Sequence, residues 1–264
     1  AFFRNLQGEP GHLYVARVTA AAALAGSVSV NNSAAAATWK IWAGQKGAKD
    51  PGAWGNQLSI AVMASSAGNS TLTVATVLSD TIIKVTSVAP FRLNDFVTVA
   101  GVGTYSAKIL AIDESANTLT LSVPAAGVCA IGQTVTVIDR TINVYLKDIL
   151  TGNVALVETW KNVTMDTDHE RYWADVINHE VTGSDYIFAE QLVTAANDLF
   201  TDLPVTGAGT VAVAVAMTLG NDGATPSNSD HAAAYSAFDL APINYLTNAE
   251  VFSESNWEDG ELYC

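Results

Sequence analysis

The sequence Asp50-Pro51-Gly52-Ala53-Trp54-Gly55-Asn56-Gln57-Leu58 lies between two apolar, β-prone runs, residues 38–42 and 58–64. Its Pro-Gly and Gly-Asn pairs are strong signals for a reversal of the chain. We therefore expect two strands joined by a loop at this point. Trp54 is expected to pin the loop to the sheet, because a large aromatic side chain is stabilised by burial.

Outside this loop, the sequence pattern of the first part of the chain predicts short strands. Residues 12–18 and 71–77 have the pattern of further strands, and residues 20–25 permit a helix. Between residues 78 and 140 the sequence consists of short β-prone runs. Turn signals separate them roughly every 8 to 12 residues, as small barrels and sandwiches require. The five β-prone runs of this block are residues 81–85, 96–99, 107–112, 118–123 and 133–138.

These runs predict a small barrel-like all-β domain at residues 78–140, with a polar hairpin loop at residues 113–117. Strand-like segments flank the block on both sides. We therefore interpret it as an insertion into a discontinuous host domain, residues 1–77 and 141–264, and expect its two ends to lie close together.

Beyond the insertion, residues 141–147 and 154–160 predict two strands across a turn at Thr151-Gly152-Asn153. The strongest helix signal follows at residues 167–181. Thr167 and Glu170 have the spacing of a capping box, and the apolar residues after them share one helical face: Tyr172, Trp173, Val176, Ile177 and Val181.

A strand at residues 184–192, an extended run at 210–219 and a helix at 229–240, stopped by Pro242, complete the expected elements. Strands and helices thus alternate in this part of the chain. The predicted fold class is α+β, a mixed sheet covered by helices and interrupted by the small all-β domain.

Charge is distributed unevenly along the chain. The 12 basic residues are all at or before Arg171, where 12 acidic residues balance them, and the other 14 of the 26 acidic residues follow. Phosphates would be repelled by this acidic last third, so we do not expect nucleic acid as a partner. A basic surface on another protein and a solvated acidic face are both compatible with it.

Each sequence motif that could indicate a metal or catalytic site is incomplete. His169-Glu170 and His179-Glu180 start like a zinc-protease helix but lack its second histidine, and Asp166, Asp168 and Glu170 are better explained as helix N-terminal charges. Neither Cys129 nor Cys264 belongs to a metal-ligand or disulfide pattern. We predict no catalytic, cofactor-binding or metal-binding residue, and no membrane span, because no apolar run approaches the roughly 20 residues needed.

The quoted loop, residues 50–58, resembles the signature of contractile phage tail sheath proteins. Leu13-Tyr14-Val15, Glu158-Thr159-Trp160, Tyr172-Trp173-Ala174-Asp175 and Leu219-Gly220-Asn221-Asp222-Gly223 resemble the same family in the same order. The resemblance implies structural roles for seven motif residues: Pro51, Gly52, Trp54, Gly55, Asn56, Asp222 and Gly223.

This resemblance implies a virion protein, made in the host cytoplasm, that polymerises around the tail tube and contracts to drive the tube through the host envelope. Its partners would be other sheath subunits and, mainly through a C-terminal domain, the tail tube protein. The chain stops soon after Ile243-Asn244-Tyr245-Leu246, where family members continue. We therefore expect a fragment without that domain or its linking arm, and expect it to be monomeric.

Two other classes stay open. A non-catalytic surface adhesin or receptor-binding virion protein would also be acidic and β-rich, and Trp39, Trp42 and Trp54 could form a carbohydrate platform instead of packing anchors. A hydrolase is the third possibility, because scattered histidines can converge in space. Glycan binding by the inserted domain would favour the adhesin, and turnover of ester or peptide substrates would favour the hydrolase.

Overall fold

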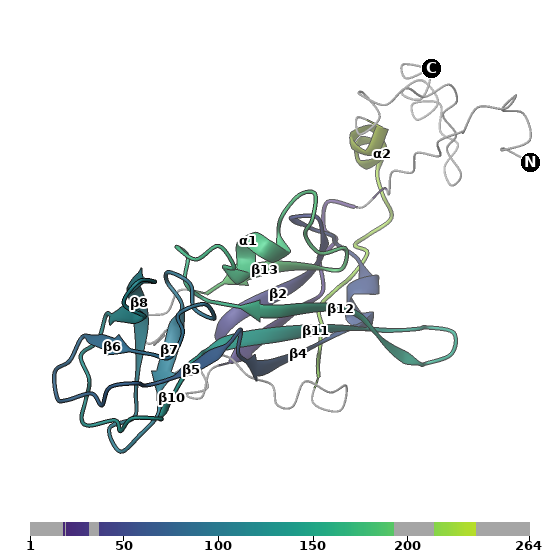
Figure 1. The fold of residues 1–264 in the computed structure, drawn as a ribbon. Helices are drawn as coiled ribbons and strands as arrows, with labels where there is room; N and C mark the ends of the chain where they lie inside the picture. The colour runs from purple at the N-terminus through teal and green to yellow at the C-terminus, as the bar shows by residue number, and fades with distance from the viewer. Residues whose placement is uncertain (1–17, 19, 32–36, 193–213, 236–264) are drawn as a thin grey trace, which may run out of the picture. The chain divides into compact units, whose positions relative to one another are not determined.

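The computed structural model describes residues 18, 20–31, 37–192 and 214–235 of the chain (Figure 1). The chain divides into two compact units. Residues 25–220 form the larger unit, and residues 1–24 with 221–264 form the smaller one. The larger unit holds the three β-sheets.

The first sheet has the strand order β1-β2-β13, and the short strand β3 also pairs with β2. Its strands are β1 (Ser27–Asn31), β2 (Ala37–Gln45), β3 (Ala48–Lys49) and β13 (Ile187–Gln191). Every pairing is antiparallel. β2 confirms the predicted strand at residues 38–42, and its alternation buries Trp39, Ile41 and Ala43 on one face.

The second sheet has the order β12-β11-β4-β14, again with antiparallel pairings only. Its strands are β4 (Leu58–Ser65), β11 (Asp139–Lys147), β12 (Val154–Val163) and β14 (Val215–Ala216). β4, β11 and β12 confirm the strands predicted at residues 58–64, 141–147 and 154–160. The short β14 lies in the run predicted as extended, whose residues 210–213 lie outside the described part of the chain.

These two sheets share one hydrophobic core. Leu58, Ile60 and Val62 of β4 pack in the same cluster as Trp39 and the other buried residues of β2. The single-turn helix α1 (Trp173–Ile177) adds Trp173, whose ring stacks on Trp39 with centroids 4.2 Å apart and an interplanar angle of 12°. The larger unit is therefore built on a two-layer β-sandwich whose layers meet through aliphatic and stacked aromatic side chains.

The third sheet has its own core and six antiparallel strands in the order β5-β10-β7-β8-β9-β6. Five strands confirm the five predicted runs, whereas the predicted strand at residues 71–77 is wrong. β5 ends at Thr71, and beyond it only Leu72 is paired, by its N–H to the Gln133 carbonyl and by an isolated bridge to Val85. The strands are β5 (Asn69–Thr71), β6 (Ile82–Lys84), β7 (Phe96–Val99), β8 (Tyr105–Asp113), β9 (Thr118–Leu121) and β10 (Thr134–Val137).

The chain leaves the sandwich at the end of β4 and returns at the start of β11. These strands pair continuously, from Ser65 opposite Asp139 to Leu58 opposite Leu146. The six-stranded sheet thus lies in the connection between two adjacent strands of another sheet. The domain boundaries proposed above, residues 1–77 with 141–264 and 78–140, stay a prediction.

The predicted α+β class is wrong. Strands hold 45% of the described residues and helices 9%, and the sheets are curled and antiparallel rather than mixed and covered by helices. The described helices are α1, the 3₁₀ turn η2 (Ala53–Gln57) and α2 (Asn228–Tyr235). The error arose from reading local helical spacing as long helices.

The helix expected at residues 167–181 shows the physical reason. Asp166 Oδ1 accepts the N–H of Asp168, and the N–H of Tyr172 donates to the His169 carbonyl, so this segment forms turns. α1 begins only at Trp173, and no side chain caps it. A capping box at Thr167 and Glu170 would contribute about 1 kcal/mol, less than the buried contacts of the neighbouring Asp166 and His169 contribute together.

The smaller unit contains α2, which begins near the predicted helix start. Ser227 caps it rather than Ser229, because Ser227 and Asp230 exchange side-chain-to-backbone hydrogen bonds. The predicted helix end at Leu240 and Pro242, and most of the predicted strand at residues 12–18, lie outside the described residues. Residues 20–25 form a turn and isolated bridges instead of a helix.

Candidate functional site

The loop quoted at the outset folds into the 3₁₀ turn η2 between β3 and β4. Gly52 precedes this turn with φ 137°, in the region that favours glycine. Its backbone bridges to Ala25 at the start of the first sheet. The Pro-Gly pair thus reverses the chain as expected, and the reversal joins the two sheets.

Asn56 links this loop to a segment 164 residues away. Its Nδ2 donates to the Gly220 carbonyl at 2.8 Å, and its Oδ1 accepts the Gly220 N–H at 2.9 Å. One amide therefore satisfies both backbone groups of Gly220. This contact, called the Asn56 clamp below, joins two of the stretches that resemble sheath proteins.

Glycines allow the backbones around the clamp to touch. A Cβ on Gly55 would lie 2.6 Å from the Cβ of Ala43, and one on Gly26 would lie 2.8 Å from the Gly55 carbonyl carbon. A Cβ on Gly220 would lie 2.6 Å from the Gly52 carbonyl oxygen. Larger residues at these positions would force the segments apart, so this part of the site is a close backbone junction.

The seven predicted motif residues are not all brought together. Pro51, Gly52, Trp54, Gly55 and Asn56 form the loop, and partly buried Trp54 packs against the sandwich core as expected. Asp222 and Gly223 belong to the smaller unit. There Gly223 has φ 74° and donates its N–H to Asn221 Oδ1, and a Cβ on it would lie 2.8 Å from the Ala23 nitrogen.

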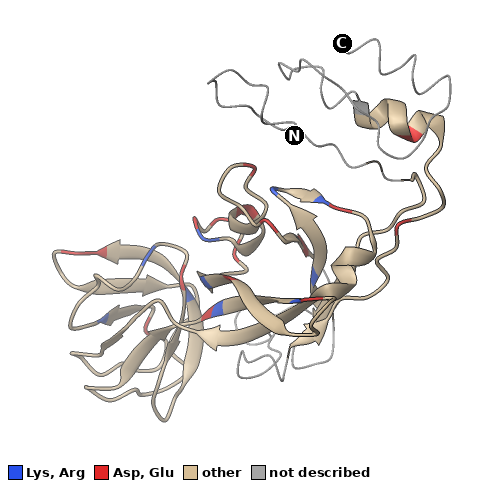
Figure 2. Cartoon of the chain, turned by 90° about the vertical axis from the view of Figure 1, so that its right-hand side faces the viewer, with Lys and Arg blue, Asp and Glu red and all other residues tan. Residues whose placement is uncertain are grey.

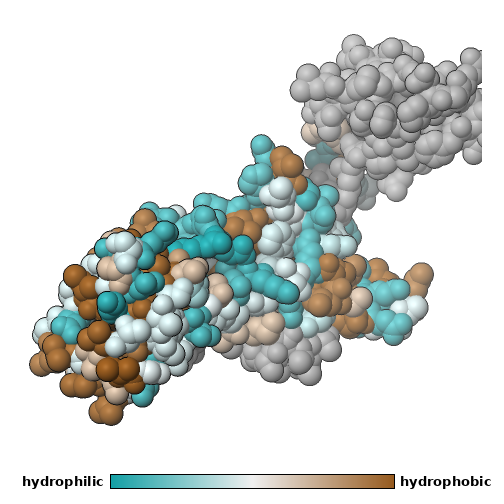
Figure 3. Space-filling view, viewed as in Figure 1, coloured by the Kyte–Doolittle hydropathy of each residue, from teal (hydrophilic) through white to brown (hydrophobic). Residues whose placement is uncertain are grey.

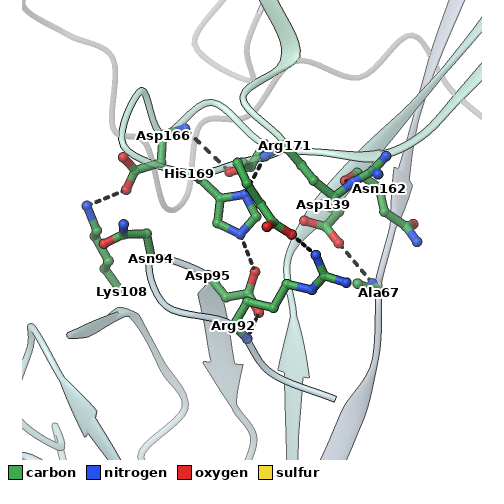
Figure 4. Close-up of polar contacts among 12 residues, drawn as sticks. Ala67, Arg92, Asn94, Asp95, Lys108, Asp139, Asn162, Asp166, His169 and Arg171 are labelled. Carbon is green, nitrogen blue, oxygen red and sulfur yellow. Dashed lines mark hydrogen bonds and ion pairs between the residues drawn. The ribbon is translucent and has the colours of Figure 1, made fainter. Parts of the chain in front are cut away.

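A second polar site, which we call the polar junction, joins the sandwich to the six-stranded sheet (Figure 4). At its centre the ring Nε2 of His169 lies 2.9 Å from Asp95 Oδ1, and both side chains are buried. His169 Nδ1 accepts the N–H of Arg171 at 2.9 Å. Nε2 therefore carries the ring proton and donates it to Asp95, whose other oxygen accepts the N–H of Arg92 at 2.6 Å.

Ion pairs surround this buried pair. Lys108 Nζ of β8 lies 2.5 Å from Asp166 Oδ2 and 3.7 Å from Asp168 Oδ2. Arg92 forms an exposed ion pair with Glu170. Basic residues of β8 and of the β6–β7 connection thus meet acidic residues of the segment that follows β12, and the segment's charges do not cap a helix as predicted.

Asp139, the first residue of β11, completes the polar junction. It is 4% exposed and accepts the N–H of Ala67 at 2.9 Å. Burial raises the pKa of Asp139 to about 6, with a smaller rise from the charge of Asp95, and the Ala67 hydrogen bond opposes the shift. Burial also lowers the pKa of Arg140 to about 10, against the favourable charge of Asp139.

The His169–Asp95 pair has the atoms of a catalytic dyad but a different geometry. Both ring nitrogens are used within the protein, one by the Arg171 N–H and the other by Asp95. In this arrangement the imidazole offers no free nitrogen to a substrate proton. Among the described residues, no group of three or more His, Cys, Asp and Glu could hold a metal ion.

Sequence reasoning missed the polar junction because its members are scattered. Asp95 and His169 are 74 positions apart, and Asp139 stands alone at a strand start. The available signal was the unusual density of charge at Asp166, Asp168, Glu170 and Arg171. That density marks a contact surface and not the predicted helix terminus.

No protein-family model, curated protein or solved structure matches this chain. Within the described ranges, no helix is both long and apolar enough to cross a membrane. The assignment of a function therefore depends on the sequence resemblance and on the geometry of the two junctions.

Proposed function

We propose that this chain is a structural subunit of a contractile phage tail sheath, a protein that polymerises around the tail tube and contracts to drive it through the host envelope. The observation that carries the proposal is the Asn56 clamp. It joins the loop and the glycine-rich segment, two stretches in which the sequence resembles sheath proteins.

The construction of the larger unit supports a mechanical role. Backbone contacts at Gly26, Gly55 and Gly220 leave no room for side chains between the joined segments. The polar junction attaches the six-stranded sheet through the buried His169–Asp95 pair and the exposed Arg92–Glu170 pair at once. Subunits that pass force to neighbours need rigid bodies whose surfaces fit two arrangements, and close-packed interiors transmit strain.

Electron microscopy of the complete gene product, alone and with a tail tube protein, tests the proposal. Rings or tubes with helical order, lengthened around the tube and shortened after triggering, are the expected result. Monodisperse particles under all conditions would contradict it. Specific glycan binding by the same particles would instead assign the chain to the adhesin or receptor-binding class.

A further inference from the structure

The six-stranded sheet is attached to the sandwich by two short connections and by the polar junction. Residues 66–68 lead from β4 to β5, and Ile138 leads from β10 to β11. The sandwich core and the core of the sheet are separate clusters, so no shared apolar core of the described residues fixes the sheet. Charged residues of both signs gather where the sheet meets the sandwich (Figure 2), and hydrophilic surface lies between the sheet and α1 (Figure 3).

Two buried carboxyl groups face each other at this attachment. The register of β7 and β10, extended by two residues beyond its last pair, places Asp95 opposite Asp139. The Ile138 N–H donates to the Phe96 carbonyl at 2.7 Å, which continues the ladder to this point. Side chains of directly opposite residues lie on the same face of a sheet, with their Cβ atoms roughly 5 Å apart. Asp95 is 3% exposed and Asp139 is 4% exposed, so water screens neither of them.

The hydrogen bonds of these two carboxyl groups are unequal. Asp95 accepts the ring N–H of His169 and the backbone N–H of Arg92, whereas Asp139 accepts the N–H of Ala67. Opposed buried carboxylates disfavour each other's charge, and the carboxyl with fewer donors is the one that keeps its proton. Asp95 therefore carries the negative charge and Asp139 carries the proton.

The groups around Asp139 agree with this assignment. Burial, and after it the charge of Asp95, raises the pKa of Asp139 to about 6. His169 and Arg171, in the segment after β12, oppose the rise. Arg140, the next residue of β11, donates to the Asp139 backbone carbonyl at 2.8 Å. Burial and the opposing acid thus outweigh the cations near this carboxyl.

We propose that the polar junction is a proton-operated latch, in which a proton on Asp139 keeps the six-stranded sheet seated against the sandwich and its release opens the junction. The position of Asp139 suits this role. It directly follows one connection, and its Oδ2 accepts the N–H of Ala67 in the other. Once ionised it faces the Asp95 carboxylate, and entry of water relieves both the repulsion and the cost of a buried charge. The latch does not depend on the proposed function.

His169 is the other group that could operate such a latch. Its ring Nδ1 accepts the N–H of Arg171, and a second ring proton would remove this acceptor. That change would open the junction as the pH falls, whereas ionisation of Asp139 opens it as the pH rises. The sign of the pH dependence therefore distinguishes the two groups.

Hydrogen exchange followed by NMR, with each rate corrected for the intrinsic rate at the same pH, tests the proposal. The backbone amides of Ala67, Arg92 and Arg171 report opening, because each donates to a side chain of the junction. Their protection should fall by up to about 100-fold as the pH rises from about 4 to about 6, and then level off. The reason is that the closed junction holds a proton on Asp139 that the open one has released.

Asp139→Asn keeps an oxygen for the Ala67 N–H and cannot ionise, so protection of the three amides should not change over this range. The matched control is Asp148→Asn, an exposed carboxyl just beyond the other end of β11, which should keep the whole decline. If Asp139→Asn does not fold, the carboxyl ¹³C resonance of Asp139 in the unmodified chain should titrate at about pH 6.

Several results would overturn the latch. Protection of the three amides equal to that of the β4–β11 ladder at every pH would mean that the junction opens only with the whole chain. Protection that does not change with pH, or an equal decline in Asp139→Asn and Asp148→Asn, would exclude Asp139 as the trigger. A loss of protection toward low pH that persists in Asp139→Asn would assign the titration to His169 instead.

Discussion

Asn56 satisfies both backbone groups of one distant residue, and the same device recurs at Asn178. The Nδ2 of Asn178 donates to the Ala189 carbonyl at 2.8 Å, and its Oδ1 accepts the Ala189 N–H at 2.7 Å. Ala189 lies on the outer edge of β13, with which no second described strand pairs. Asn178 therefore takes the place of a neighbouring strand at Ala189, and Asn56 satisfies the backbone of Gly220 outside any strand.

Replacement of Asn56 measures how much its two hydrogen bonds contribute to the free energy of unfolding. Asn56→Ala removes two hydrogen bonds and should lower the free energy of unfolding by about 1 kcal/mol, since the site is exposed and water can replace the amide. Asn56→Asp keeps the acceptor for the Gly220 N–H but turns a carboxylate oxygen toward the Gly220 carbonyl oxygen, so it should not rescue the loss. Urea denaturation measures both, and an unchanged midpoint in Asn56→Ala would contradict the clamp.

Asp139 makes stability depend on pH. Its pKa rises from 3.8 to about 6 on folding, so the folded state holds a proton that the unfolded chain has released. The free energy of unfolding should therefore fall as the pH rises from about 4 to about 6, by up to about 3 kcal/mol. Asp139→Asn should flatten this decline in urea titrations made at several pH values.

The exposed Asp113→Asn is the control for Asp139, because hydrogen bonds from Ser115 and Ala116 lower the pKa of Asp113. That variant should keep the decline between about pH 4 and 6. If Asp139→Asn declines as steeply as the unmodified protein, another group carries the dependence.

At the scale of elements, the polar junction shows how a turn segment and a strand are held together. Asp95, beside the start of β7, accepts hydrogen bonds from His169 in the segment after β12 and from the backbone of Arg92. Lys108 of β8 reaches Asp166 in the same segment. These contacts at His169 and Asp166 fix the segment in turns, so it does not continue α1 toward its N-terminus.

Asp95→Ala tests this account, because it leaves the His169 ring N–H and the Arg92 N–H without their acceptor. The free energy of unfolding should fall by about 2 to 3 kcal/mol, the cost of buried donors left unsatisfied. Hydrogen exchange should quicken first at residues 164–172. Asp113→Ala, at the exposed end of β8, removes hydrogen bonds of its own turn but should leave exchange at residues 164–172 unchanged, and equal exchange in both variants would argue against the junction.

At the scale of the whole larger unit, the six-stranded sheet is inserted between two strands that are direct neighbours. Ser65 ends β4 opposite Asp139, the first residue of β11. The sandwich core and the core of the six-stranded sheet form separate clusters of buried residues. The sandwich strands thus need only a tight turn at this point to remain paired.

Excision of residues 66–138 tests this organisation. An Asn-Gly turn in their place would convert β4 and β11 into a simple hairpin. The shortened chain should fold with reduced stability, because His169 and Asp166 lose their partners Asp95 and Lys108. Near-ultraviolet circular dichroism of the stacked Trp39 and Trp173 is the measurement. A spectrum without tertiary signal would show that the sandwich requires the six-stranded sheet.

Local patterns predicted the strands well and the helices poorly. Trp39, Ile41 and Ala43 alternate over a few residues, and the alternation survives in β2 because one face of the sheet is buried. The spacing at Trp173 and Ile177 was equally regular, yet it yielded a helix of five residues. The capping box predicted before this helix would contribute about 1 kcal/mol to its stability. The contacts of Asp166 and His169 exceed that contribution.

The candidate sites were predictable only in part. The Pro51–Asn56 loop was visible because Pro-Gly and Gly-Asn restrict the backbone directly. Its contact with Gly220, 164 residues away, was not, since nothing local selects one distant glycine over another. The polar junction was missed for the same reason.

By itself, the sequence determined where strands form and where the chain turns, together with the imbalance of charge, because these follow from neighbouring residues. Only the tertiary structure decided that Asn56 meets Gly220, that Asp95 holds His169 and that β4 pairs with β11 across the inserted sheet. Such contacts join residues 74 and 164 positions apart. Their free energy depends on burial and geometry that exist only once the sheets have packed.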